Sequence, residues 1–98
     1  MSLLVQKQKK VSVGHRGRFD IIANILGAAM RGAKKTQLMY RCNLSFRQLE
    51  VYLGLLTAKK LINGRLCIES KKVIVYKTTE KGQSFLQVYH SLQALLTP

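Results

Sequence analysis

The sequence predicts a mostly helical α+β fold with three helices, a β-hairpin and a fourth, C-terminal helix. Two observations support this order. Residues 18–62 carry apolar residues at helical spacing, interrupted by glycine and by residues that form turns and helix caps. Residues 65–77 contain two short runs rich in β-branched and aromatic residues, which are typical of strands. With 98 residues, the chain is long enough for one domain with a modest core.

The first helix is expected from about Arg18 to Met30, and Gly32 ends it. Five apolar residues share one face at the i, i+3, i+4, i+7 spacing and are expected in the core: Phe19, Ile22, Ile25, Leu26 and Ala29. Residues 1–17 precede this helix as a basic N-terminal arm with four Lys or Arg and no acid. The arm either contacts nucleic acid or is a terminus without a role.

A break between two short helices follows. Thr36 is expected to cap the second helix, from about Gln37 to Cys42, and Asn43 and Leu44 form a turn. Ser45 begins the third helix, because it starts the S-x-x-Q pattern of a capping box. One apolar stripe of this helix is expected to face the core: Leu49, Tyr52, Leu53 and Leu56. The opposite face presents Arg47, Gln48, Val51 and Gly54.

Asn63 and Gly64 are expected to end the helical stretch. The runs RLCIE (65–69) and VIVYK (73–77) then form a hairpin with a basic tip at Ser70, Lys71 and Lys72. Residues 18–78 make up the predicted domain. Thr79 caps a last helix from Glu80 to Leu96, so residues 79–98 form a separate C-terminal element.

The last helix carries more apolar surface than one small core requires. Its apolar residues recur at a spacing typical of coiled coils, and neighbouring apolar residues widen the stripe. We expect a homodimer interface formed by Phe85, Val88, Tyr89, Leu92, Leu95 and Leu96. The alternative is a helix packed wholly against its own domain.

The composition is strongly basic. Seventeen Lys and Arg against four Asp and Glu give a net charge of +13. A polyanionic partner relieves this self-repulsion, which favours nucleic acid first and an anionic membrane surface second. No apolar stretch is long enough to span a bilayer, and residues 1–10 lack the features of a signal peptide. We therefore expect a cytoplasmic, nucleoid-associated protein.

The residues that perform catalysis or bind metals are sparse. Four acids, two distant histidines and no glycine-rich phosphate loop give no catalytic set, so an enzyme is not expected. Cys42, Cys67, His15 and His90 do not cluster as metal ligands, and both cysteines are expected as reduced core residues. No metal, cofactor or small-molecule effector is predicted.

The break in the helical pattern indicates a function. Two short helices joined by a tight turn must cross steeply, as in a helix-turn-helix, with the N-terminal end of the second helix projecting. The major groove of double-stranded DNA is wide enough to admit such a helix. The hairpin is then a wing, whose tip reaches the adjacent backbone or minor groove. The predicted fold is therefore a winged helix-turn-helix.

The sequence also resembles an archaeal winged-helix family of small chromatin-associated DNA-binding proteins and predicted transcriptional regulators. The resemblance covers about residues 18–89 and is carried by GAKKTQLMY, NLSF, YLGLL and YKTTEKG. It implies a winged-helix fold, binding of double-stranded DNA and dimerisation through the C-terminal helix. Lys60 stands where this family usually has glycine at the end of the third helix.

The predicted DNA contacts divide into those that position the protein and those that read bases. Lys34, Lys35 and Thr36 at the start of the second helix suit a phosphate, or else form a solvated basic loop. Lys71 and Lys72 at the wing tip are expected on the backbone. Three further cations have the same role or are simply solvated: Arg41, Lys59 and Lys60.

Base contacts are expected from the first turns of the third helix, which begins at Ser45. Arg47 suits guanine and Gln48 suits adenine. Phe46 and Val51 suit a thymine methyl group, although Phe46 is equally compatible with the core. Because one Arg and no Lys lie between residues 45 and 58, phosphate contacts are expected to dominate binding.

Two other functions remain open at the level of sequence. Winged helices also serve as protein–protein interaction modules of the transcription machinery. RNA binding is the other alternative, but most Tyr and Phe fall on core stripes rather than on a stacking platform.

Overall fold

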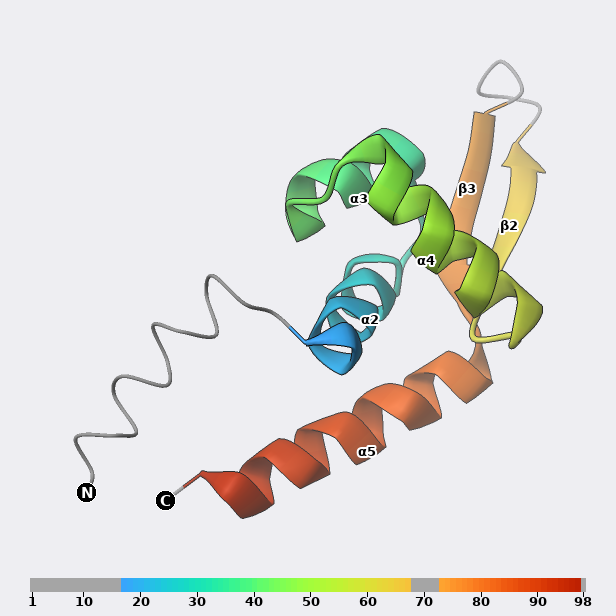
Figure 1. Cartoon of the computed structure of the whole chain (residues 1–98). Coiled ribbons are helices and arrows are strands. Elements are labelled where there is room, and N and C mark those ends of the chain that lie inside the picture. The colour runs from blue at the N-terminus through green and yellow to red at the C-terminus, as the bar shows by residue number, and fades with distance from the viewer. Residues whose placement is uncertain (1–16, 68–72, 98) are drawn as a thin grey trace.

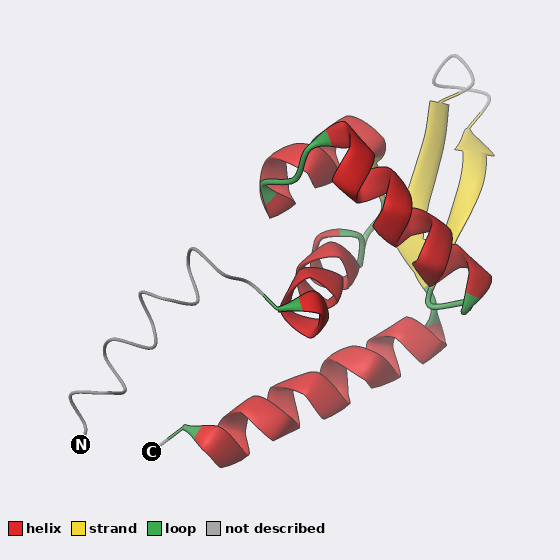
Figure 2. Cartoon of the chain, viewed as in Figure 1, coloured by secondary structure: helices red, strands yellow, loops and turns green. Residues whose placement is uncertain are grey.

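The predicted mixture of helices and strands is confirmed. The computed structural model describes residues 17–67 and 73–97, whose elements follow one another as in Figure 1 and Figure 2. These elements are α2 (Arg18–Ala28), β1 (Ala33–Lys34), α3 (Lys35–Cys42), α4 (Phe46–Ala58), β2 (Ile62–Cys67), β3 (Val73–Thr78) and α5 (Glu80–Leu96). Most of the basic N-terminal arm and the predicted wing-tip residues Lys71 and Lys72 lie outside the described residues. No helix within 17–67 or 73–97 is long and apolar enough to cross a membrane.

The core lies where α2, α3 and α4 meet the sheet. Its fully buried side chains come from all of these elements: Ile25, Leu26, Leu38, Cys42, Leu49, Leu56 and Ile62. The predicted faces of the first and third helices are therefore largely correct. Phe19 is an exception, with 67% of its surface exposed. It lies in the first turn of α2, where its ring faces Phe85 of α5 at 6.3 Å between centroids instead of entering the core.

The sheet has one strand that the sequence did not predict. Strand β1 pairs antiparallel with β3, and the strand order is β1-β3-β2. Thr78 at the end of β3 is buried, and its hydroxyl donates to the Leu26 carbonyl at 2.6 Å. Gly32, which precedes β1, has a φ of +95°, a conformation that glycine adopts without strain. These contacts fix the sheet against the C-terminal end of α2.

The third helix ends earlier than predicted. Asn63 and Gly64 are not its stop, because both lie inside β2. Helix α4 ends at Ala58, and Lys60 then takes the left-handed conformation with a φ of 62°. A Cβ on Gly64 would lie 2.9 Å from the Tyr76 ring, so this glycine serves packing across the hairpin rather than a turn.

Helix α5 has the predicted limits and the predicted cap. The Thr79 hydroxyl accepts from the Gly82 N–H at 3.0 Å and donates to the Lys60 carbonyl at 2.7 Å. Gly82 is buried, and a Cβ there would lie 2.2 Å from the Leu61 carbonyl oxygen. The first turn of α5 is therefore held close to the turn between α4 and β2, while the rest of α5 extends past α2 (Figure 1).

Candidate nucleic-acid interface

A tight turn separates α3 from α4. Asn43 takes the left-handed conformation with φ and ψ of 53°, which Asn tolerates better than most side chains. The buried Leu44 follows, and its N–H donates to the Met39 carbonyl at 3.1 Å. This turn makes α3 and α4 cross steeply, with the N-terminal end of α4 at the surface (Figure 1).

The predicted capping box at the start of α4 is present. The Ser45 Oγ accepts from the Gln48 N–H at 3.1 Å, and the Gln48 Oε1 accepts from the Ser45 N–H at 2.9 Å. Both side chains satisfy backbone donors that a helix start leaves unpaired. Bidentate pairing of Gln48 with adenine uses the same Oε1, so base reading by Gln48 competes with the cap.

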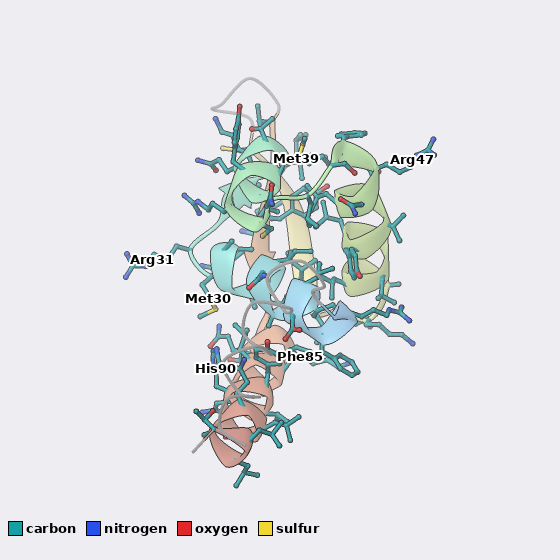
Figure 3. The ribbon with its side chains drawn as sticks, turned by 60° about the vertical axis from the view of Figure 1, so that its left-hand side comes forward. Met30, Arg31, Met39, Arg47, Phe85 and His90 are labelled. Carbon is teal, nitrogen blue, oxygen red and sulfur yellow. The ribbon has the colours of Figure 1, made fainter. Side chains whose placement is uncertain are left out.

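The exposed face of α4 is open and carries few charges. Arg47 extends outward from the helix (Figure 3), and Val51 is 66% exposed. Gly54 continues this face, and a Cβ placed there would meet nothing within 4 Å. The opposite stripe is buried at Leu49 and Leu53. The helix therefore presents one side that another molecule can approach closely.

The Lys35 side chain is held by two contacts rather than solvated freely. Its ammonium group donates to the carboxylate of Glu50 on α4 and lies 5.0 Å from the centre of the Phe46 ring. The hydrogen bond to Glu50 raises the pKa of Lys35 above its ordinary value. Phe46 is 55% exposed, which excludes the alternative that its ring belongs to the core.

The start of α3 differs from the prediction. Thr36 is not its N-cap. The cap is Lys34, whose backbone N–H donates a hydrogen bond to the Gln37 Oε1 at 2.8 Å. The reason is tertiary, since pairing of Lys34 with Val75 holds residue 34 extended, and the helix begins directly after it. Thr36 therefore lies exposed within the first turn of α3.

Arg41 has a contact within the domain. Its Nη1 donates to the Ala28 carbonyl at 3.2 Å, at the C-terminal end of α2. A cation in this position satisfies a terminal carbonyl and complements the helix dipole. Arg41 thus connects α3 to α2, in addition to any contact with a partner.

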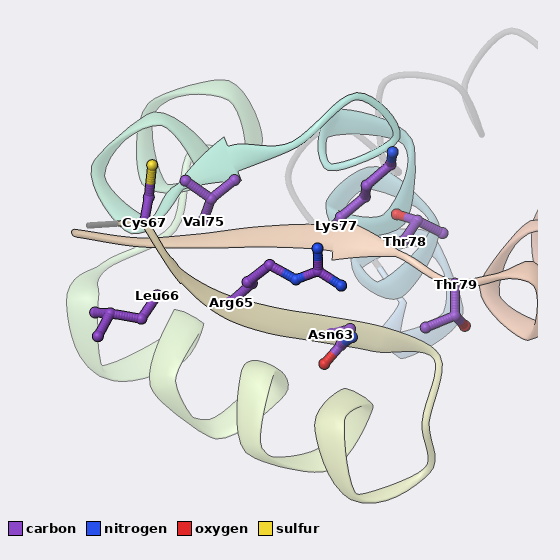
Figure 4. Close-up of a pocket in the computed structure, with 8 residues that line it drawn as sticks. All are labelled: Asn63, Arg65, Leu66, Cys67, Val75, Lys77, Thr78 and Thr79. Atoms are coloured by element: carbon purple, nitrogen blue, oxygen red, sulfur yellow. The ribbon is translucent and has the colours of Figure 1, made fainter. Parts of the chain in front are cut away.

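The hairpin has two cations on its outer face that the sequence reasoning did not select. Arg65 and Lys77 line a hollow of about 560 Å³ together with Asn63 and Thr79 (Figure 4). Asn63 pairs with Lys77 and Arg65 with Val75, so these residues share one face of the two strands. The alternation of polar and apolar residues in the hairpin is the sequence signal that could have found them.

Comparison with known families gives one match that covers most of the chain. The family model described as winged helix-turn-helix matches residues 15–97. The chain belongs to the winged helix-turn-helix family. This finding confirms the resemblance expected from the sequence.

Several solved structures of winged-helix proteins have the same fold. Sso10a-2, a DNA-binding protein from Sulfolobus solfataricus, is 20% identical with a TM-score of 0.73, over 82% of this chain and 81% of that chain. MepR from S. aureus, in a structure with DNA, is 16% identical with a TM-score of 0.69, over 97% and 82%. The reduced transcriptional regulator YodB from B. subtilis is 19% identical with a TM-score of 0.67, over 90% and 84%. Among curated proteins, none matches this sequence.

The predicted dimer residues of α5 fall into two groups. Phe85 and Tyr89 turn toward α2, and the Tyr89 hydroxyl donates to the Asp20 carboxylate. Burial, together with this hydrogen bond, raises the pKa of Tyr89 to about 12. The other four are at least half exposed: Val88 at 68%, Leu92 at 54%, Leu95 at 81% and Leu96 at 80%. Phe85, Val88, Tyr89, Leu92 and Leu96 line one hollow beside the start of α2, so they share one apolar face of α5. Contact with α2 covers Phe85 and Tyr89, and the rest of this face stays uncovered.

Proposed function

We propose that this protein binds double-stranded DNA as a transcriptional regulator or chromatin-associated protein, with α4 in the major groove. The observation that carries the proposal is the exposed face of α4, where Arg47 and Val51 project beside the open space at Gly54 while the opposite stripe is buried. A major groove about 12 Å wide admits a helix presented in this way. Further support comes from the DNA-binding description of Sso10a-2 and from the structure of MepR with DNA.

Phosphate contacts are assigned to three basic parts of the chain. Lys34, Lys35 and Thr36 lie at the start of α3, where backbone N–H groups and the helix dipole favour an anion. The wing tip, with Lys71 and Lys72, and the N-terminal arm supply further cations. Such contacts fix the register of the protein on the duplex without reading its sequence.

Base reading is assigned to a small set of side chains. Arg47 is the cation of α4, and its exposed side chain can pair with guanine. Phe46 and Val51 offer apolar contacts to thymine methyl groups. Ser45 and Gln48 hold the helix start and contribute to bases only in part. The sequence preference is therefore modest, and most of the affinity is electrostatic.

A salt titration tests the proposed function directly. If four to eight phosphates are neutralised, log K against log salt concentration has a slope of about −4 to −7. The measurement is fluorescence anisotropy of a labelled duplex of about 20 base pairs, which covers two turns of B-form DNA. An affinity that does not change with salt, or no binding at low salt, contradicts the proposal.

We assign homodimerisation to the exposed side of α5. Val88, Leu92, Leu95 and Leu96 leave an apolar strip at the surface that a second copy can cover. A two-fold dimer places two α4 helices on one duplex, so the preferred DNA site is roughly palindromic.

A further inference from the structure

Glu50 is an unusual residue for the face on which it lies. It sits one turn after Arg47 on the exposed face of α4, and its side chain is 44% exposed. The sequence contains no other acid between residues 21 and 68, in a chain with seventeen Lys and Arg. An acid facing a polyanion repels it, so this one position opposes the charge of its surroundings.

The contact made by Glu50 gives this acid a specific effect. Its carboxylate accepts a hydrogen bond from Lys35, a cation assigned to phosphate binding. While the pair is intact, Lys35 offers little net charge to a phosphate. Both side chains remain partly exposed, at 32% for Lys35 and 44% for Glu50, and exposed ion pairs of this kind contribute little stability. Either partner can therefore exchange the other for a group on DNA.

The major groove offers such groups unequally. Cytosine presents an amino donor at N4 with no acceptor on that edge, and adenine presents one at N6 beside the N7 acceptor, whereas guanine presents acceptors at O6 and N7 and thymine presents one at O4. A carboxylate accepts from the cytosine amino group and is repelled by the acceptor edges. If Glu50 turns to a cytosine, Lys35 is released and gains a phosphate as a charge-assisted partner.

We propose that Glu50 is a specificity-determining residue of the DNA interface. It lowers affinity for DNA of arbitrary sequence by neutralising Lys35, and it favours sites where a cytosine amino group replaces Lys35 as its partner. This inference rests on the proposed function. It also supplies a base contact that Arg47 alone does not provide.

The test uses Glu50→Gln, which removes the charge and keeps the size of the side chain. On duplexes of random sequence, the variant should bind several-fold more tightly, and its slope of log K against log salt should steepen by about 0.9, the value for one additional phosphate. Selection of bound duplexes from a random pool should show a weaker cytosine preference than the unmodified protein shows, because the neutral amide oxygen is a poorer acceptor than the carboxylate. The control is Glu80→Gln, which changes net charge equally at the start of α5 and should leave the slope and the preference unchanged.

A second variant separates this role from a structural one. In a Lys35→Met background, Glu50→Gln should no longer steepen the slope, because the cation that it releases is absent. If Glu50 only holds α4 against α3, Glu50→Gln weakens binding to all duplexes and leaves the slope unchanged, which overturns the inference. The inference is also overturned if Glu50→Gln and the unmodified protein have the same affinity, slope and base preference. In that case the proposed function still stands, because the unmodified protein binds DNA. Absence of duplex binding by the unmodified protein overturns both.

Discussion

Lys60 adopts a left-handed backbone conformation, which is unfavourable for any residue that has a Cβ atom. Its φ is 62°, and a left-handed conformation costs an L-residue roughly 1–2 kcal/mol. Replacement by glycine removes that cost but gives the unfolded chain more freedom, so Lys60→Gly should stabilise the protein by about 0.5–1 kcal/mol. Urea unfolding measures the change. The adjacent Lys59 has a φ of −88°, and Lys59→Gly should destabilise by a similar amount; equal effects at both positions would contradict the explanation.

Ser45 holds the start of α4 through its hydroxyl. Ser45→Ala removes the bond to the Gln48 N–H and should cost about 1 kcal/mol of folding free energy. The measurement is the shift of the thermal or urea midpoint. Ser84→Ala, at an exposed position within α5, is the matched control and should be close to neutral. Equal losses from the two variants would mean that the cap contributes nothing.

Single residues also show why the interface could be predicted only in part. Ser45 and Gln48 follow a local pattern three residues apart, so their mutual contacts were expected. The pairing of Lys35 with Glu50 joins residues fifteen positions apart on different helices, and no local pattern encodes it. The base-reading and phosphate-binding roles assigned to individual residues stay predictions, since they depend on a partner.

Whole elements were predictable where their signals were local. Helix α5 has a cap, an acid in its first turn and a continuous apolar stripe, and its limits were correct. Strand β1 has two residues and exists only because β3 lies beside it, so its sequence carries no periodicity. The end of α4 was misplaced because Lys60 takes a conformation usually reserved for glycine, while Gly64 looked like a turn residue but packs under Tyr76.

The position of α5 depends on the absence of a side chain at Gly82. A Cβ there would lie 2.2 Å from the backbone oxygen of Leu61, which cannot move as a side chain does. Gly82→Ala should therefore displace the start of α5 and destabilise the fold by about 2 kcal/mol or more, as overpacking does. Gly27→Ala in α2 meets nothing within 4 Å and should stabilise by about 0.5–1 kcal/mol. Calorimetric unfolding of both variants tests the contrast, and two changes of the same sign would contradict it.

Charge and apolar surface act on the whole molecule in opposite ways. A net charge of +13 on each chain repels a second copy, whereas it attracts a duplex. Added salt screens both interactions. Self-association through α5 should therefore strengthen as salt rises, while DNA binding weakens. These opposite dependences separate association driven by α5 from association mediated by contaminating nucleic acid.

The dimer itself can be tested with two leucines of equal exposure. Leu92 on α5 and Leu66 on β2 are both 54% exposed, so the same substitution changes a similar exposed apolar area in the single chain. Burial of a leucine in an interface contributes roughly 1.5–3 kcal/mol, so Leu92→Gln should weaken self-association by about 10-fold or more. Light scattering over a concentration series at moderate salt measures the mass. Leu66→Gln should leave the mass at two chains, because β2 lies outside the proposed interface. If the unmodified protein has the mass of one chain at micromolar concentration, the uncovered side of α5 does not bind a second copy.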